Sequence, residues 1–380
     1  MAASRHLPER NLSFLHSSFD DPLFPQNTPM SLEKFLIKQL EVKGASQPNN
    51  FGVRTQNAKA ENGRPLTVLS IDESSVDMAS VADAASLAAF YNAKFFHETL
   101  DAGGQLAEFM PRHAASFSPH DGIVAIAIDD VSVRGERMLQ LTLDELCQVS
   151  ERLAQLHSAH LLPRDAAEDI RRTIDENYDV VQEFIMAEAE NTVRGGVVEI
   201  EQKLSPYFSN PQAVREKLMT VISCPPSNES LPSDAAVLCH GALAYDRCTF
   251  DGRGQLVGID GWMSVHTGHP AEDIASLIIS SAEPSVRRKE YMKIIRHYFY
   301  TLVDNHRPPV QLPEMRAAFK RAHREVVLRR LGPLLDELRC PALGDDAKQI
   351  LAKRWESALD DAVIFAEGDD ASGDEQCFFK

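Results

Sequence analysis

The sequence predicts an α+β fold with two lobes, a small lobe that holds a reduced sheet and a larger lobe that is mostly helical. Short apolar runs rich in β-branched residues occur before residue 130, and apolar residues recur at helical spacing from residue 142 onward. One hairpin signal, at residues 248–260, stands among the helices. Strands first and helices later is the pattern of an α+β protein.

The first 130 residues are expected to form an extension and then the small lobe. Residues 1–30 carry four prolines among Ser, Asn and Asp, which predicts a flexible extension. Apolar β-branched runs predict strands, and an Ala-rich segment between them predicts a helix. In chain order, the small lobe (31–130) is expected to contain an amphipathic helix at 31–40, a polar loop at 44–64, a strand at 66–71, a helix at 81–100 and a strand at 122–128.

The helical lobe is expected to span residues 131–366. It opens with Thr142 and Glu145, a capping box in which each side chain satisfies a free backbone amide of the helix start. Further helices are predicted to open near 165 and at 211, and to span 284–304, 313–338 with a break at Gly332-Pro333, and 345–365. The acidic residues 367–380 are expected to form a disordered tail.

Composition excludes some functional classes. The chain has 380 residues and a formal net charge of −17 without a dense Lys/Arg run, so neither a nucleic acid nor a membrane is expected as a partner. No apolar run follows Met1, and no stretch reaches the roughly 18 apolar residues that a membrane helix needs. A cytoplasmic protein is expected.

The six cysteines are scattered without C-x-x-C spacing, which predicts buried free thiols in a reducing compartment. Cys239 and Cys248 flank one loop and could approach each other. A zinc site that they would share with His240 or His266 is not expected, because no metal-ligand spacing supports it.

The most informative segment runs from residue 238 to 277. It contains a His-Gly pair at 240–241, then Ile-Asp-Gly-Trp at 259–262, then Gly-His-Pro-Ala-Glu-Asp at 268–273. This ensemble resembles the ecdysteroid-kinase-like (CHK) branch of the aminoglycoside phosphotransferase and choline kinase superfamily. That family has H-G-D-x-x-x-x-N in its catalytic loop, then I-D-W, then G-x-P-A-x-D. The resemblance spans about residues 65–300 and implies a protein-kinase-like fold.

The resemblance also shows which catalytic positions have changed. The catalytic Asp position holds Ala242, and the Asn position holds Arg247. Aligning the tryptophan places Gly261 at the metal-binding Asp. The position of the strand Lys that holds phosphate is Ser70, and the helix Glu that pairs with that Lys is replaced by Leu87.

Two remnants of the motif are retained. His240 frames the loop in the family, and a structural role is expected for it here. Asp260 lies one residue before the expected metal ligand, so its side chain should turn to the opposite face of the strand unless a bulge returns it. Asp260 is therefore the one candidate metal ligand.

These changes favour a pseudokinase, a folded member without phosphotransferase activity that binds an unknown protein partner or small-molecule ligand. No cofactor is expected in that case. The alternative is an ATP- and Mg-dependent kinase for a choline-like or steroid alcohol, with a rearranged site. Asp260, Asp246 and Asp251 would then supply carboxylates, and Arg247 would contact phosphate.

Overall fold

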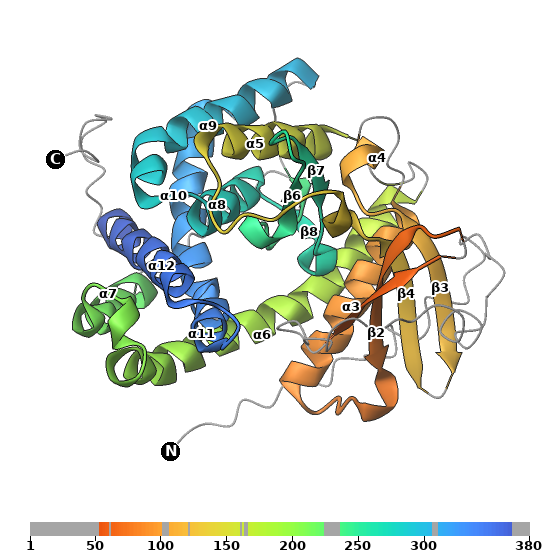
Figure 1. Ribbon diagram of the computed structural model, residues 1–380, viewed down its shortest axis with the longest axis horizontal. Coiled ribbons are helices and arrows are strands. Elements are labelled where there is room, and N and C mark those ends of the chain that lie inside the picture. Colours follow the sequence, from red (N-terminus) through yellow and green to blue (C-terminus); the bar gives the residue numbers. More distant parts are fainter. Residues whose placement is uncertain are drawn as a thin grey trace.

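The computed structural model describes residues 53–60, 62–100, 106–120, 122–159, 162, 166–223, 236–305 and 311–366. It has the α+β, two-lobed architecture that the sequence predicts, with a sheet and one helix at one end and a helical body at the other (Figure 1). The predicted extension at 1–30, the helix at 31–40 and the tail at 367–380 lie outside the described residues. Within the described ranges, no helix is both long and apolar enough to cross a bilayer.

The small lobe is a four-stranded antiparallel sheet in the order β1-β2-β4-β3, with α3 packed on one face. The predicted strands at 66–71 and 122–128 and the helix at 81–100 are confirmed as β2, β4 and α3. The elements are β1 (Arg54–Lys59), β2 (Pro65–Asp72), α3 (Val81–Thr99), the short α4 (Leu106–Phe109), β3 (His113–His120) and β4 (Ile123–Asp129).

Two strands of this sheet were not expected. The loop predicted for residues 44–64 is wrong for 54–59, which form β1 at the sheet edge. Only Ala58 of β1 is buried, so the strand carries no apolar alternation and is held by its pairing with β2. The second, β3, has few β-branched residues, contains Pro119 and shifts register twice against β4, which hides its pattern.

The large lobe contains the predicted helices and two small strand pairs. The capping box at Thr142 and Glu145 is confirmed, and the predicted break near Pro333 falls earlier, at Arg330, because proline is tolerated in the first turn of the next helix. The elements are α5 (Leu143–Ser158), α6 (Ala167–Gln202), α7 (Pro211–Ser223), β5 (Val237–Cys239), β6 (Cys248–Phe250), β7 (Leu256–Ile259), β8 (His266–Gly268), α8 (Pro270–Ser281), α9 (Pro284–Asn305), α10 (Leu312–Arg329), α11 (Leu331–Arg339) and α12 (Asp345–Ala366).

Helix α6 belongs to both lobes. It has 36 residues and runs from beside α3 to α7 and α11 (Figure 1). Its first turns already contribute Ile170 and Ile174 to the core of the helical lobe, and after them Tyr178 and Val181 join the buried cluster between α3 and the sheet. Near its end, Val197 and Ile200 join the core of the helical lobe. The sequence predicted a helix opening near residue 165 but did not indicate that it would link two cores.

Candidate functional site at the degenerate catalytic loop

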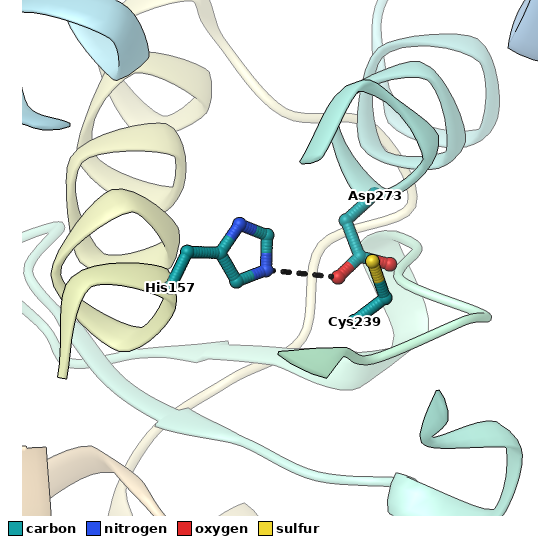
Figure 2. Close-up of side chains that lie close together, drawn as sticks. All are labelled: His157, Cys239 and Asp273. Atoms are coloured by element: carbon teal, nitrogen blue, oxygen red, sulfur yellow. Dashed lines mark ion pairs between the residues drawn. The ribbon is translucent and has the colours of Figure 1, made fainter. Parts of the chain in front are cut away.

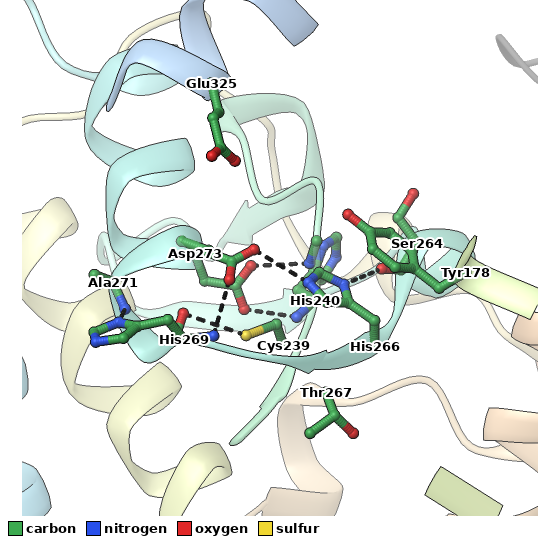
Figure 3. Close-up of polar contacts among 12 residues, drawn as sticks. Tyr178, Cys239, His240, Ser264, His266, Thr267, His269, Ala271, Asp273 and Glu325 are labelled. Carbon is green, nitrogen blue, oxygen red and sulfur yellow. Dashed lines mark hydrogen bonds and ion pairs between the residues drawn. The ribbon is translucent and has the colours of Figure 1, made fainter. Parts of the chain in front are cut away.

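The loop that follows β5 is held by one buried carboxylate. Both oxygens of Asp273, which is 0% exposed in the first turn of α8, accept backbone N–H groups of the loop: His240 at 2.6 Å and Gly241 at 2.9 Å (Figure 3). Burial opposes ionisation, but His157 and His240 outweigh it, and the pKa of Asp273 falls to about 2. The carboxylate therefore stays ionised and fixes the start of the loop.

His240 lies inside this framework and not at a reacting surface. Its side chain is fully buried and packs against Trp262 with ring centroids 4.5 Å apart. Its Nε2 donates to the backbone oxygen of Asp260 at 2.8 Å, which leaves Nδ1 to accept from the amide of Ala242 at 3.2 Å. Burial lowers the pKa of His240 and favours the neutral ring. This arrangement supports the framing role expected from the sequence.

Glycine is required at position 241. The residue has φ +80°, and a Cβ built there would lie 2.1 Å from the backbone oxygen of Ser264. The loop therefore runs in direct contact with the segment that follows Trp262. Beside it, Ala242 is exposed, and its methyl group can neither accept a proton nor bind a cation.

The Arg247 side chain lies where a side chain at position 261 would begin. Gly261 has φ +85°, and a Cβ at this position would meet Arg247 Cδ at 2.7 Å and Nε at 3.0 Å. The Arg247 side chain thus fills the volume next to Gly261, where the aligned family position has its metal-binding carboxylate. The two positions that the sequence singled out separately are therefore in direct contact.

Asp260 does not present a free carboxylate. It forms an ion pair with Arg137, which precedes α5. Burial raises the pKa of Asp260, and Arg137 and Arg247 only partly offset that rise. Its Oδ1 is buried without a hydrogen-bond partner among the described residues. The left-handed Gly261 follows directly, so the chain turns immediately after this strand.

Asp246 belongs to the same charged group. It lies 3.5 Å from Arg247, and its Oδ1 is likewise buried without a described hydrogen-bond partner. Burial favours its neutral form, but Arg247, Arg330 and Arg137 outweigh burial and lower its pKa. Asp251, the third carboxylate considered, is used in the hairpin turn, where it accepts the amides of Arg253 and Gln255.

Ser70 and Leu87, which the resemblance assigned to nucleotide binding, carry no charge. Ser70 is half-buried on β2, opposite Arg54 of β1 and Ala125 of β4. Its neighbours Leu69 and Ile71 pack against α3, where Leu87 belongs to the same buried cluster. Because side chains alternate along a strand, Ser70 lies on the opposite face of the sheet from α3. The structure does not bring Ser70 and Leu87 together as a phosphate-binding pair.

Sequence reasoning missed Arg137 and Arg330. Arg137 is 123 residues from its partner Asp260, and Arg330, which lies between α10 and α11, bonds Glu337 at 3.2 Å. Glu337 in turn accepts from Tyr245 Oη at 3.0 Å. No local motif marks either arginine, and only the fold places them beside the loop.

Comparison with known proteins gives a family and a set of related folds. The model of the ecdysteroid kinase-like family matches residues 94–308, more than half of the chain. This match and the strand-then-helix architecture confirm the expected protein-kinase-like fold. No curated protein matches.

Three solved structures illustrate the likeness. Spectinomycin phosphotransferase APH(9)-Ia is 12% identical, with 86% of this chain and 92% of that chain covered and a TM-score of 0.49. Amicoumacin kinase hAmiN is 11% identical, with 84% and 88% covered and a TM-score of 0.45. Choline kinase LicA from Streptococcus pneumoniae is 14% identical, with 86% and 96% covered and a TM-score of 0.42.

Proposed function

The chain belongs to the ecdysteroid kinase-like family, and from that premise we propose that it is a pseudokinase, which binds a small ligand or a protein partner without transferring phosphate. The observation that carries the proposal is the Arg247 side chain packed against Gly261. A guanidinium there repels a divalent cation, and a carboxylate at 261 would fit only if the Arg247 side chain moved away.

The remaining requirements of phosphoryl transfer point the same way. The reaction needs positioned metal ions, a cation on the phosphates and a carboxylate that accepts the hydroxyl proton. Ala242 removes that proton acceptor, a change that alone lowers a rate by about 10²–10⁴-fold. Ser70 and Leu87 remove the Lys–Glu pair. The effects are not additive, but each removes a separate part of the machinery.

One observation favours a second candidate, an ATP-dependent kinase for small alcohols with a rearranged site. Asp246 Oδ1 and Asp260 Oδ1 are both buried without a described hydrogen-bond partner, and such oxygens can bind a cation. Against it, Arg137 and Arg247 lie beside the same carboxylates and supply their countercharge.

The two candidates differ in ADP release. Full-length protein is incubated with Mg-ATP and a panel of amino and steroid alcohols, and ADP release and the magnesium dependence of the ATP-induced Tm shift are measured. We expect no acceptor-dependent ADP release and no magnesium-dependent shift.

The Asp260→Asn variant and its control Asp251→Asn, altered in the hairpin turn, should match the wild type in both measurements. Acceptor-dependent ADP release that survives in Asp251→Asn and is lost in Asp260→Asn would establish the active kinase.

A further inference from the structure

Three potential metal ligands from three separate elements meet beneath the loop (Figure 2). They are His157 in the last turn of α5, Cys239 at the end of β5 and Asp273 in the first turn of α8. Their ligand atoms, a ring nitrogen, a thiol sulfur and a carboxylate oxygen, all lie within 4.8 Å of one another. We propose that this cluster is a structural zinc site, distinct from any magnesium site of the catalytic loop.

The spacing of the ligand atoms fits a tetrahedral ion. His157 Nε2 lies 3.4 Å from Asp273 Oδ2, beyond the usual hydrogen-bond range of about 2.7–3.2 Å. Nε2 is also buried without a hydrogen-bond partner among the described residues, and the His157 side chain is only 1% exposed. Two ligands at about 2.0–2.1 Å from a tetrahedral zinc ion are themselves about 3.4 Å apart.

Neighbouring groups orient these ligands as they do in zinc proteins. His157 Nδ1 lies 2.7 Å from the hydroxyl of Tyr298 on α9. When a metal ion takes the place of a proton on Nε2, Nδ1–H donates to that hydroxyl, and the lone pair of Nε2 points toward the ion between Cys239 and Asp273. Asp273 is fixed by the two loop amides, which leave lone pairs on its oxygens. The ring and the carboxylate are therefore already oriented for a metal.

Charge and ligand type select the ion. A thiolate, a carboxylate and a neutral imidazole carry a total charge of −2, so a divalent ion makes the buried site neutral. Magnesium and calcium prefer oxygen ligands alone, whereas a sulfur, nitrogen and oxygen set suits zinc. The backbone oxygen of His269, 3.6 Å from Cys239 Sγ, or a water can take the fourth position. Such an ion would link α5, β5 and α8 through side chains, one of which, Asp273, also holds the backbone of Gly241.

The test measures metal content and metal spectroscopy on the full chain. Cys239→Ser is compared with Cys248→Ser, since both cysteines are fully buried on either side of the loop and only Cys239 belongs to the cluster. We expect about one zinc per chain in the wild type and in Cys248→Ser, and a thiolate-to-cobalt charge-transfer band after cobalt(II) substitution. Zinc affinity in Cys239→Ser should fall by more than about 100-fold, beyond the range for losing an outer-shell partner.

A second variant keeps the proposal testable if Cys239→Ser does not fold. Tyr298→Phe leaves all three ligands in place and removes only the hydroxyl next to His157, so zinc affinity should fall by about 10–100-fold while the cobalt–thiolate band persists. The proposal is overturned if the wild type binds no zinc and shows no cobalt–thiolate band. It is equally overturned if Cys239→Ser and Cys248→Ser bind zinc with the same affinity. Neither readout involves nucleotide, so the outcome is independent of the pseudokinase proposal.

Discussion

Arg247 shows how one side chain can change the chemistry of a whole loop. Its stem packs against Gly261, its guanidinium faces Asp246 at 3.5 Å, and its charge also acts on Asp260. The side chain thus places a cation beside two buried carboxylates. The charged group at the loop is thereby neutralised by protein side chains alone.

This contact predicts a measurable coupling between positions 247 and 261. Gly261→Asp alone should destabilise the protein by about 2–4 kcal/mol, because the new side chain adopts a left-handed backbone and overlaps Arg247. Combining it with Arg247→Asn should recover the part of this loss in unfolding free energy that comes from overlap with Arg247. A double-mutant cycle measured by urea unfolding should then give a coupling of about 0.5–3 kcal/mol.

Gly254 provides the matched control for this cycle. It has a similar φ of +73°, but a Cβ there meets nothing within 4 Å. Gly254→Asp should therefore show only the backbone penalty and no coupling to Arg247→Asn. Equal coupling at both glycines would contradict the steric contact.

At this scale the sequence located the altered positions but not their contacts. The fixed spacing of the motif was enough to identify Ala242, Arg247 and Gly261. It could not show that two of them share one volume, or that Arg137 pairs with Asp260 from 123 residues away. Such contacts depend on tertiary packing, which motif spacing does not encode.

At the scale of elements, a buried histidine joins α10 to α12. His323 is 1% exposed and donates Nε2–H to the backbone oxygen of Ala358 at 2.9 Å. Burial, together with nearby Arg287, lowers its pKa to about 4. The packing of these two helices therefore requires the neutral ring.

The pH dependence follows from the sign of this shift. In the unfolded chain the histidine titrates near pH 6.5, so on acidification the unfolded state takes up a proton first. The stabilising effect is complete above about pH 6.5 and is lost as the pH falls toward 4, by up to about 3 kcal/mol. Urea unfolding should show His323→Gln less stable than the wild type at pH 7. The difference between their free energies of unfolding should narrow toward pH 4. A difference that stays constant with pH would count against this account.

Helices and strands were predictable when the residues that indicate them lie within the element itself. Capping residues and helical spacing identified α5, α7, α9 and α12, because those signals lie within each helix. The edge strand β1 could not be recognised, since its stability comes from a neighbour and not from its own apolar pattern.

At the scale of the whole molecule, α6 couples the two lobes. Val181 packs in the small-lobe core and Val197 in the large-lobe core, so one continuous helix contributes to both. The two-lobed order was predictable from strands preceding helices. The role of α6 was not, because its apolar spacing shows that a face is buried and not which lobe buries it.

This coupling predicts that the lobes unfold together. Ala187, exposed on α6 between Val181 and Val197, is a suitable position for breaking the helix. Ala187→Pro costs about 3 kcal/mol of helix stability, whereas Ala187→Gly costs about 1. Calorimetry should show one transition in all three proteins, with the Tm lowered most in Ala187→Pro, because Ile174 and Val181 still join the two cores on the N-terminal side of the break. Two separate transitions in the proline variant would contradict this coupling.

The interlocked pair at 247 and 261 also bears on how this chain can evolve. Introducing aspartate at 261 first places it against the arginine, and introducing asparagine at 247 first removes one of the three cations that act on Asp246. Either order passes through a less stable protein, and natural proteins have little stability to lose. A carboxylate at 261 is therefore reached with less loss of stability when both positions change together than when either one changes first.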